Sequence, residues 1–189
     1  MSAVGIPAGP PPATPGFFLR IARHLRRVLR PWRKVPDGLT IRNLRPDDLP
    51  KFFLPFERAL GERWLADQEA GKMYVAVAEI DGEAVGRSCL LYHHASDPPS
   101  AYMFASTVRP QWRSRGIGTA LIAHNEQVAR SQGLYHIYSR TGTNNPRAAS
   151  WRERMGYRRA GEEHVRWEEA DGRQVEADVW RFERTLRRP

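Results

Sequence analysis

The middle of the chain carries, in order, the local patterns that produce a β-α-β crossover. Residues Ala101 to Val108 are rich in strand-forming types, and the run from Thr119 to Gln132 places apolar residues at helical spacing. Gly133 stands where a helix end favours a left-handed residue, and Leu134 to Ser139 again favours a strand. Such a crossover joins two strands of one sheet and lays the helix against its face. It therefore predicts a mixed α and β (α/β) domain built around a single sheet.

Strand signals outnumber helix signals in the rest of the chain. Two β-rich runs, Met73 to Ile80 and Ala84 to Tyr92, are joined by Asp81-Gly82, a strong hairpin signal. The other elements that the sequence predicts are strands at Leu39–Leu44, Tyr157–Trp167 and Val175–Arg184, a turn at Asp171-Gly172, and a helix at Pro146–Met155.

Positive charge is concentrated at the N-terminus. Seven of the 30 basic residues and none of the 21 acidic residues precede Asp37, so the remainder of the chain holds 30 − 7 = 23 basic residues against 21 acidic ones. A nearly neutral body lacks the basic face that nucleic-acid-binding domains present to phosphates. We therefore expect no nucleic-acid binding by the body.

Residues 1–36 are expected to form a segment separate from one domain at residues 37–189. Residues 1–16 are mostly Ala, Pro and Gly, which predicts a disordered tail. From Phe17 to Arg30, apolar residues and arginines share helical spacing, which predicts a basic amphipathic helix. Residues 17–34 could thus reach an anionic membrane surface or an acidic partner. Packing on the chain's own domain and an organelle transit segment are the alternatives.

Cysteine usage and hydropathy indicate a soluble protein of a reducing compartment. Cys89 is the only cysteine, so no internal disulfide can form. No apolar run approaches the roughly 20 residues that span a bilayer, and no signal-peptide hydrophobic region is present. We therefore expect a cytoplasmic protein. The six histidines are scattered, and no metal site is expected.

The turn between the strand at Ala101 to Val108 and the helix that follows it has the features of a phosphate-binding loop. Gly116 and Gly118 allow the backbone to turn tightly, and the first amides of the helix lack intrahelical partners. A nucleoside-triphosphate loop needs Gly-Lys before Ser or Thr, and a dinucleotide loop needs a glycine at position 121, which is Leu121. The pattern that remains is Gln/Arg-x-x-Gly-x-Gly/Ala, matched by Arg113, Gly116 and Gly118.

A second motif follows about thirty residues later, where both ends of a helix are marked. Asn145 is a favoured N-cap, Pro146 a favoured first residue and Gly156 a favoured terminator. The helix between them contains Ala148, in an Asn-x-x-Ala pattern, and leads directly into Tyr157.

With these motifs in this order, the chain resembles the GCN5-related N-acetyltransferase (GNAT) family from about Leu39 to Arg184. The resemblance implies a mixed, mostly antiparallel sheet flanked by helices, with a splayed central strand pair. It implies acetyl-CoA as co-substrate, with the end of the strand at Val108 pairing with the pantetheine arm. The residues implied to bind the cofactor are Val108, Arg113, Ser114, Arg115, Gly116, Ile117, Gly118, Thr119 and Asn145.

One position departs from the family pattern. Many members carry a tyrosine four residues before the glycine of Gly-aromatic, where it protonates the departing thiolate, but here that position is Arg152. A guanidinium does not release a proton at working pH, although its charge can stabilise a thiolate. The alternative is that Arg152 points to water or to cofactor phosphates.

The general base is also open. Tyr102 stands about where some relatives carry a carboxylate base, and His93 has a suitable intrinsic pKa. Glu57 and Glu62 are further candidates. The sequence thus predicts transfer of acetyl to a primary amine, on a small molecule or a peptide, by direct attack in a ternary complex. A catalytically weak or inactive acyl-CoA-binding module is the alternative, and the chain could be a monomer or a homodimer.

Overall fold

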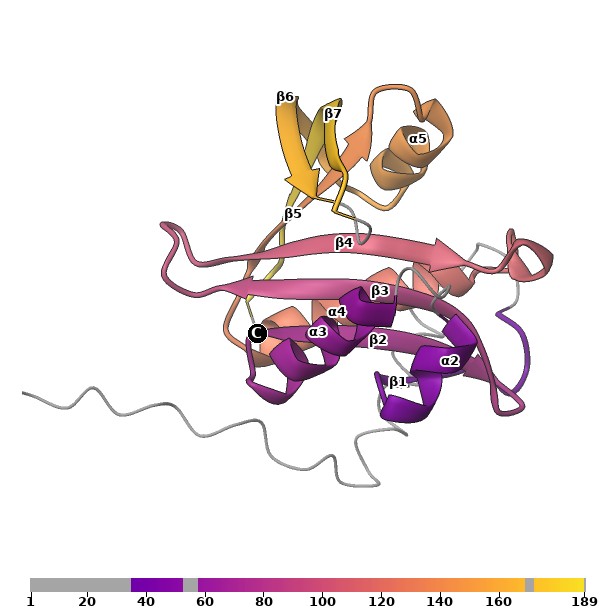
Figure 1. Ribbon diagram of the computed structural model, residues 1–189. Helices are drawn as coiled ribbons and strands as arrows, with labels where there is room; N and C mark the ends of the chain where they lie inside the picture. The colour runs from indigo at the N-terminus through magenta and orange to yellow at the C-terminus, as the bar shows by residue number, and fades with distance from the viewer. Residues whose placement is uncertain (1–34, 53–57, 169–171, 189) are drawn as a thin grey trace, which may run out of the picture.

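Seven strands form a single sheet in the computed structural model, which describes residues 35–52, 58–168 and 172–188 (Figure 1). The strand order is β1-β2-β3-β4-β5-β7-β6, and every neighbouring pair is antiparallel except β4 and β5. The mixed, mostly antiparallel sheet that the family resemblance implies is therefore confirmed. The strands are β1 (Thr40–Asn43), β2 (Met73–Ile80), β3 (Glu83–His93), β4 (Ser100–Val108), β5 (His136–Gly142), β6 (Arg158–Glu168) and β7 (Gln174–Thr185).

Helices cover both faces of the sheet (Figure 1). Ile122 of α4 packs with Leu90 and Ile137, and we call this side the α4 face. Trp64 of α3 packs with Val75 on the opposite side, the α3 face. The helical elements are η1 (Pro46–Asp48), α2 (Leu49–Phe52), α3 (Arg58–Glu69), η3 (Pro110–Trp112), α4 (Ile117–Ser131) and α5 (Pro146–Arg154).

The glycine signals identified the chain reversals correctly. Asp81 and Gly82 both have positive φ, 50° and 79°, as the two-residue hairpin between β2 and β3 requires. Gly133 and Gly156 follow α4 and α5 with φ of 72° and 84°. These left-handed residues end each helix and release the chain into the next strand.

Element boundaries differ from the prediction most at β5 and α4. Strand β5 spans His136–Gly142 rather than Leu134–Ser139. Helix α4 begins at Ile117, two residues before the predicted Thr119, because Gly118 is a residue type that disfavours helices and the prediction therefore placed it in the loop. The predicted N-terminal tail and basic helix, within residues 1–34, and Glu57 lie outside the described residues. No helix in the described part of the chain is long and apolar enough to span a membrane.

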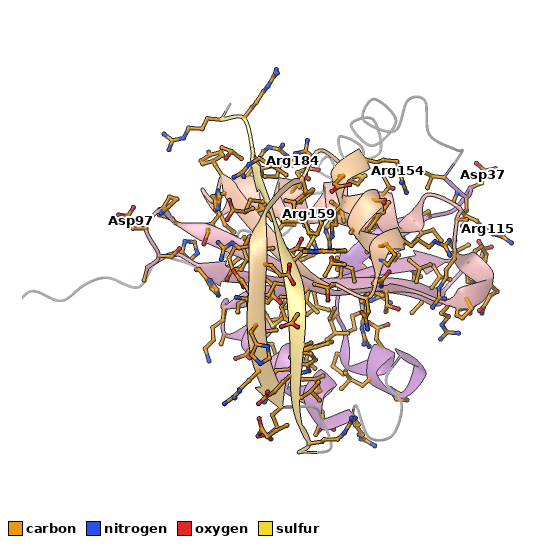
Figure 2. All side chains as sticks on the ribbon, turned by 90° about the horizontal axis from the view of Figure 1, so that it is seen from above. Asp37, Asp97, Arg115, Arg154, Arg159 and Arg184 are labelled. Atoms are coloured by element: carbon orange, nitrogen blue, oxygen red, sulfur yellow. The ribbon has the colours of Figure 1, made fainter. Side chains whose placement is uncertain are left out.

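Figure 2, viewed from above, shows how β4 is placed. Asp97, in the turn before β4, and Arg115, in the turn after it, lie at opposite ends of the molecule. The β6–β7 hairpin, which carries Arg159 and Arg184, crosses the direction of the central strands. The turn after β4 is therefore far from the β3–β4 connection and close to the start of α4.

Candidate active site

Strands β4 and β5 part halfway along β4. Their parallel pairing extends only from Ser100–His136 to Met103–Ser139. Beyond Met103, β4 continues to Val108 without a partner strand on this side among the described residues, whereas β3 follows it on the other side as far as Gly86. In the second half of β4, the backbone edge that faces β5 is therefore not paired with it.

A bulge lies at the point of parting. Cys89 pairs with Phe104 and Arg87 pairs with Thr107, so two residues of β4, Ala105 and Ser106, stand opposite one residue of β3. Ala105 adopts a left-handed φ of 48°, which is unusual for a residue with a side chain. A bulge of this kind bends its strand and increases the local twist. It accounts for the departure of β4 from the line of β5.

The extra residue also changes which side chains of β4 face which helix. Before the bulge, Phe104 packs with Trp64 on the α3 face. After it, Val108 lies beside Gly86 and Leu121 of the α4 face. Without the bulge, residues four apart in a strand would face the same side of the sheet. With it, Phe104 and Val108 face opposite sides.

The turn after β4 delivers backbone amides to the start of α4. Gly116 caps the helix in the left-handed conformation, φ 81°, and its carbonyl accepts the first helical bond from the Ala120 amide at 3.0 Å. The amides of Ile117, Gly118 and Thr119 precede that bond and lie outside the helical ladder. Together with the helix dipole, they form a site suited to phosphate oxygens.

Arginine side chains surround this turn. Arg113 donates through Nε to the Val108 carbonyl at 2.9 Å, which fastens the turn to the end of β4. The Arg115 guanidinium lies 5.0 Å from the Trp112 ring centroid, a cation–π distance. Both arginines are exposed, so their remaining donors face solvent beside the helix start. The predicted loop residues thus come together around one site.

Helix α5 approaches the same site from the β5 side. A Cβ built on Gly118 would lie 3.4 Å from Cζ2 of Trp151 and 3.9 Å from Cγ2 of Val108. Asn145 caps α5 as predicted, because its Oδ1 accepts from the Ala148 amide at 3.1 Å. The side-chain oxygen of Asn145 is therefore engaged in capping the helix.

Arg152 is buried rather than directed to water, so the alternative that it points to solvent is wrong. Only 5% of the residue is exposed, and Nη1 donates to Sδ of Met103 at 3.4 Å. The guanidinium also lies 5.1 Å from the Trp151 ring centroid and 5.6 Å from that of Tyr157. Burial lowers the pKa of Arg152 from its usual value. The cation is thus held next to the last paired residue of β4.

A polar clamp holds α5 in this position. The Glu126 carboxylate of α4 accepts from the Tyr157 hydroxyl at 3.1 Å and from Nη1 of Arg184 at 2.8 Å. The same Arg184 nitrogen donates to the Met155 carbonyl at the end of α5, at 2.7 Å. Burial raises the pKa of Glu126, against the lowering effect of Arg184 and the hydroxyl. The clamp ties α4, α5 and β7 together.

The two candidate bases lie on the α3 face, opposite Arg152. The Tyr102 and Tyr138 rings stack at 4.9 Å, and the Tyr138 hydroxyl lies 3.1 Å from Nδ1 of His93. Burial, followed by the charge of Arg140, lowers the pKa of His93. Tyr102 and His93 are therefore linked through Tyr138, and burial favours the neutral form of the histidine.

The remaining candidates do not join this site. Glu62 lies exposed on α3 and pairs with Arg58 at 3.0 Å. Cys89 is fully buried, and burial raises the pKa of its thiol to about 12, which leaves it unsuited to nucleophilic attack. Among the described residues, no group of three or more His, Cys, Asp or Glu is placed to hold a metal ion.

Sequence reasoning missed a polar chain that leads from α4 to the bulge. Asn125 donates through Nδ2 to Oγ of Ser88 at 2.9 Å, and that oxygen lies 2.8 Å from Oγ of Ser106. The available signal was Asn125 itself, a polar residue four positions after Leu121 on the apolar side of a helix. Asn125 is fully buried.

Comparisons with known proteins agree with this geometry. A family model described as the acetyltransferase (GNAT) family matches residues 39–157. A mycothiol acetyltransferase of Streptomyces avermitilis is 28% identical over 160 residues, covering 74% of this chain and 51% of the relative. The chain thus spans about half the length of this curated relative.

Solved structures share the fold. The ribosomal-protein-alanine N-acetyltransferase of Brucella melitensis superposes with a TM-score of 0.63 at 19% identity, over 78% of this chain and 99% of that one. A GNAT family acetyltransferase of Elizabethkingia anophelis, solved with acetyl-CoA bound, gives 0.57 at 17% identity, over 80% and 100% of the two chains.

Proposed function

Because the chain belongs to the acetyltransferase (GNAT) family, an acetyl-CoA-dependent class of acyltransferases, we propose that it transfers acetyl to a primary amine by direct attack in a ternary complex. The observation that carries the proposal is the continuity of the β4 edge with the amides at the start of α4. An extended pantetheine arm pairs with the β4 edge beyond Met103, and the pyrophosphate lies at Gly116 to Thr119.

Within that arrangement, Arg113, Ser114 and Arg115 lie along the pyrophosphate and Ile117 contributes its amide. Arg113 and Arg115 supply positive charge, and among the described residues neither forms an ion pair with a carboxylate. Asn145 caps α5, which lies on the β5 side of the site, and in this arrangement it faces the cofactor. Val108 ends the strand against which the arm lies.

The reaction joins the acceptor nitrogen to the acetyl carbon and breaks the carbon–sulfur bond. The electron pair of that bond leaves on sulfur, and the proton lost by the amine neutralises the thiolate directly or through water. Arg152 stabilises the developing thiolate by charge, because it is buried beside Met103 where β4 and β5 part. His93 and Tyr138, joined by a hydrogen bond, are the candidate groups that first take up the amine proton on the opposite face, before it returns through water to the thiolate; Tyr102 stacks on the Tyr138 ring.

The acceptor is an amine of a small molecule or a peptide. The names of the relatives illustrate both classes: one is a mycothiol acetyltransferase and another a ribosomal-protein-alanine N-acetyltransferase. Cys89 is buried with a raised pKa, which favours direct attack over an acetyl-cysteine intermediate.

Release of free thiol from acetyl-CoA tests the activity. The full chain is incubated with a panel of small amines, amino acids and peptides, and thiol is followed with a colorimetric reagent. Arg152→Ala should lower kcat at least tenfold while leaving the Kd for acetyl-CoA nearly unchanged, and Arg152→Lys should retain part of the rate. An unchanged kcat in Arg152→Ala would remove the assigned role.

A second candidate is a binding module that retains the acyl-CoA pocket with little turnover. The presence of Arg152 in place of the usual tyrosine favours it, because the thiolate then lacks a proton donor at that position. In this reading residues 37–189 form the pocket, and the basic segment at residues 17–34 carries the domain to an anionic surface. Acetyl-CoA binding without thiol release across the panel, together with sedimentation on anionic vesicles, would favour this candidate.

A further inference from the structure

We propose that Ser106 is a cofactor-binding residue that donates a hydrogen bond to a carbonyl oxygen of the acyl-pantetheine chain, with its direction set by Asn125 through Ser88. The proposal rests on the proposed function and adds a side-chain contact to it. Ser106 is exposed on the part of β4 that has no pairing with β5.

The direction of the hydrogen bonds that join Asn125, Ser88 and Ser106 is set at Asn125. Its Nδ2 lies 2.9 Å from Oγ of Ser88 and 3.4 Å from the Ser88 backbone carbonyl. A carbonyl oxygen can only accept, so the amide nitrogen must face this pair and donate. The orientation of the Asn125 amide is therefore fixed by its neighbour.

The hydroxyl of Ser88 can then donate its hydrogen in one direction, toward Ser106. Its oxygen accepts from Asn125, and its own hydrogen needs an acceptor, which Oγ of Ser106 supplies at 2.8 Å. Ser88 is fully buried, so water does not compete for this hydrogen. Ser106 thus accepts from Ser88, and its own hydrogen is left to point away from the protein.

Two features make this donor suited to a ligand. Successive hydrogen bonds in a buried chain polarise one another, which strengthens the last donor. The bulge places Ser106 with Val108 on the α4 face, where the loop at Gly116 and the side chain of Trp151 also lie. A carbonyl of an extended amide or of the thioester is the complementary acceptor along this edge.

Ser106→Ala tests the donor, with Ser106→Thr as the variant that keeps the hydroxyl. The Kd of coenzyme A and of acetyl-CoA is measured by calorimetry on the full chain, with a thermal melt of each variant. Loss of one neutral hydrogen bond corresponds to about a three- to tenfold weaker Kd. Ser106→Thr should bind within about twofold of the wild type and melt at the wild-type temperature. Ser106→Ala should melt slightly lower, because it leaves the buried Ser88 hydroxyl without its acceptor, so its Kd is measured well below the melting temperature.

The matched control is Thr107→Ala, which removes a hydroxyl from the neighbouring exposed residue, paired with Arg87 of the α3 face. It should leave both Kd values unchanged. Ser88→Ala, which removes the polarising bond but keeps the Ser106 hydroxyl, should weaken binding less than Ser106→Ala does.

The two ligands identify the carbonyl. Equal losses for coenzyme A and acetyl-CoA in Ser106→Ala would place the bond on a pantetheine amide, and a loss for acetyl-CoA alone would place it on the thioester; either supports the proposal. Wild-type affinity in Ser106→Ala, or an equal loss in Thr107→Ala, would overturn it while the proposed function stands. Failure of the wild-type chain to bind either ligand would overturn both.

Discussion

Alanine at Gly116 and at Gly118 should have opposite effects, although the two glycines belong to one loop. Gly116 holds a φ of 81°, where an L-residue costs about 1–2 kcal/mol. Alanine also restricts the unfolded chain, which returns about 0.4–1 kcal/mol. The net expectation for Gly116→Ala is a loss of about 1 kcal/mol in the free energy of unfolding.

Gly118 is a residue of α4, where alanine is favoured over glycine by up to about 1 kcal/mol. The new methyl would meet Cζ2 of Trp151 at 3.4 Å, the short edge of ordinary contact. Gly118→Ala is therefore expected to leave stability unchanged or to raise it by about 0.5 kcal/mol. The matched pair should differ by about 1–1.5 kcal/mol, the sum of these two estimates.

Urea unfolding gives the free energies, and a thermal melt should show a difference of about 3–6 °C between the variants. Calorimetry with coenzyme A adds the functional measurement. Gly116→Ala should weaken binding at least tenfold, because it shifts the amides at the start of α4, whereas Gly118→Ala should bind nearly as the wild type does. Equal losses of stability and affinity in the two variants would refute the argument from φ.

Two further predictions concern buried polar residues of α4. Burial lowers the pKa of His124 to about 4, so the folded protein keeps this histidine neutral near neutral pH. The unfolded chain binds the proton more readily, with a pKa of about 6.5. The free energy of unfolding should therefore fall as the pH drops from 6.5 toward 4, by about 3 kcal/mol in total. His124→Gln, which can retain a bond to the Tyr74 hydroxyl, 3.0 Å from Nε2, should flatten the stability curve between pH 6.5 and 4, and curves that stay parallel would contradict the assignment. Arg184→Ala should cost about 2–4 kcal/mol because it leaves the Glu126 carboxylate buried with only the Tyr157 hydroxyl. Adding Glu126→Gln should recover part of the loss in urea unfolding, and no recovery would show that the charge is not the cause.

The fold could be predicted largely from local patterns, because its reversals depend on residues whose conformational preferences are strong. Asp81-Gly82 determines a hairpin, Gly133 and Gly156 end helices, and Asn145 caps α5 through its own side chain. The geometry of the loop proposed to bind the cofactor was equally accessible, because a strand, a left-handed glycine and a helix start follow one another directly in the chain.

The chemistry of the site was less accessible, since it depends on contacts between distant segments. The burial of Arg152 depends on Met103, which is 49 residues away. The link from Asn125 to Ser106 runs through Ser88 and needs the register of β3 and β4, including the bulge, to be known. Sequence spacing contains neither of these facts.

In the proposed function, the bulge allows β4 to face both substrates. Tyr102 and Phe104 lie on the side of the candidate bases, whereas Ser106 and Val108 lie on the side of the coenzyme loop. Removal of Ala105 would leave each of these side chains on its present side, because the residue is the surplus one in the pairing with β3. The shortened strand would straighten and could continue its ladder with β5. Its edge would then be occupied by its own neighbour, and the space proposed for the thioester would be filled.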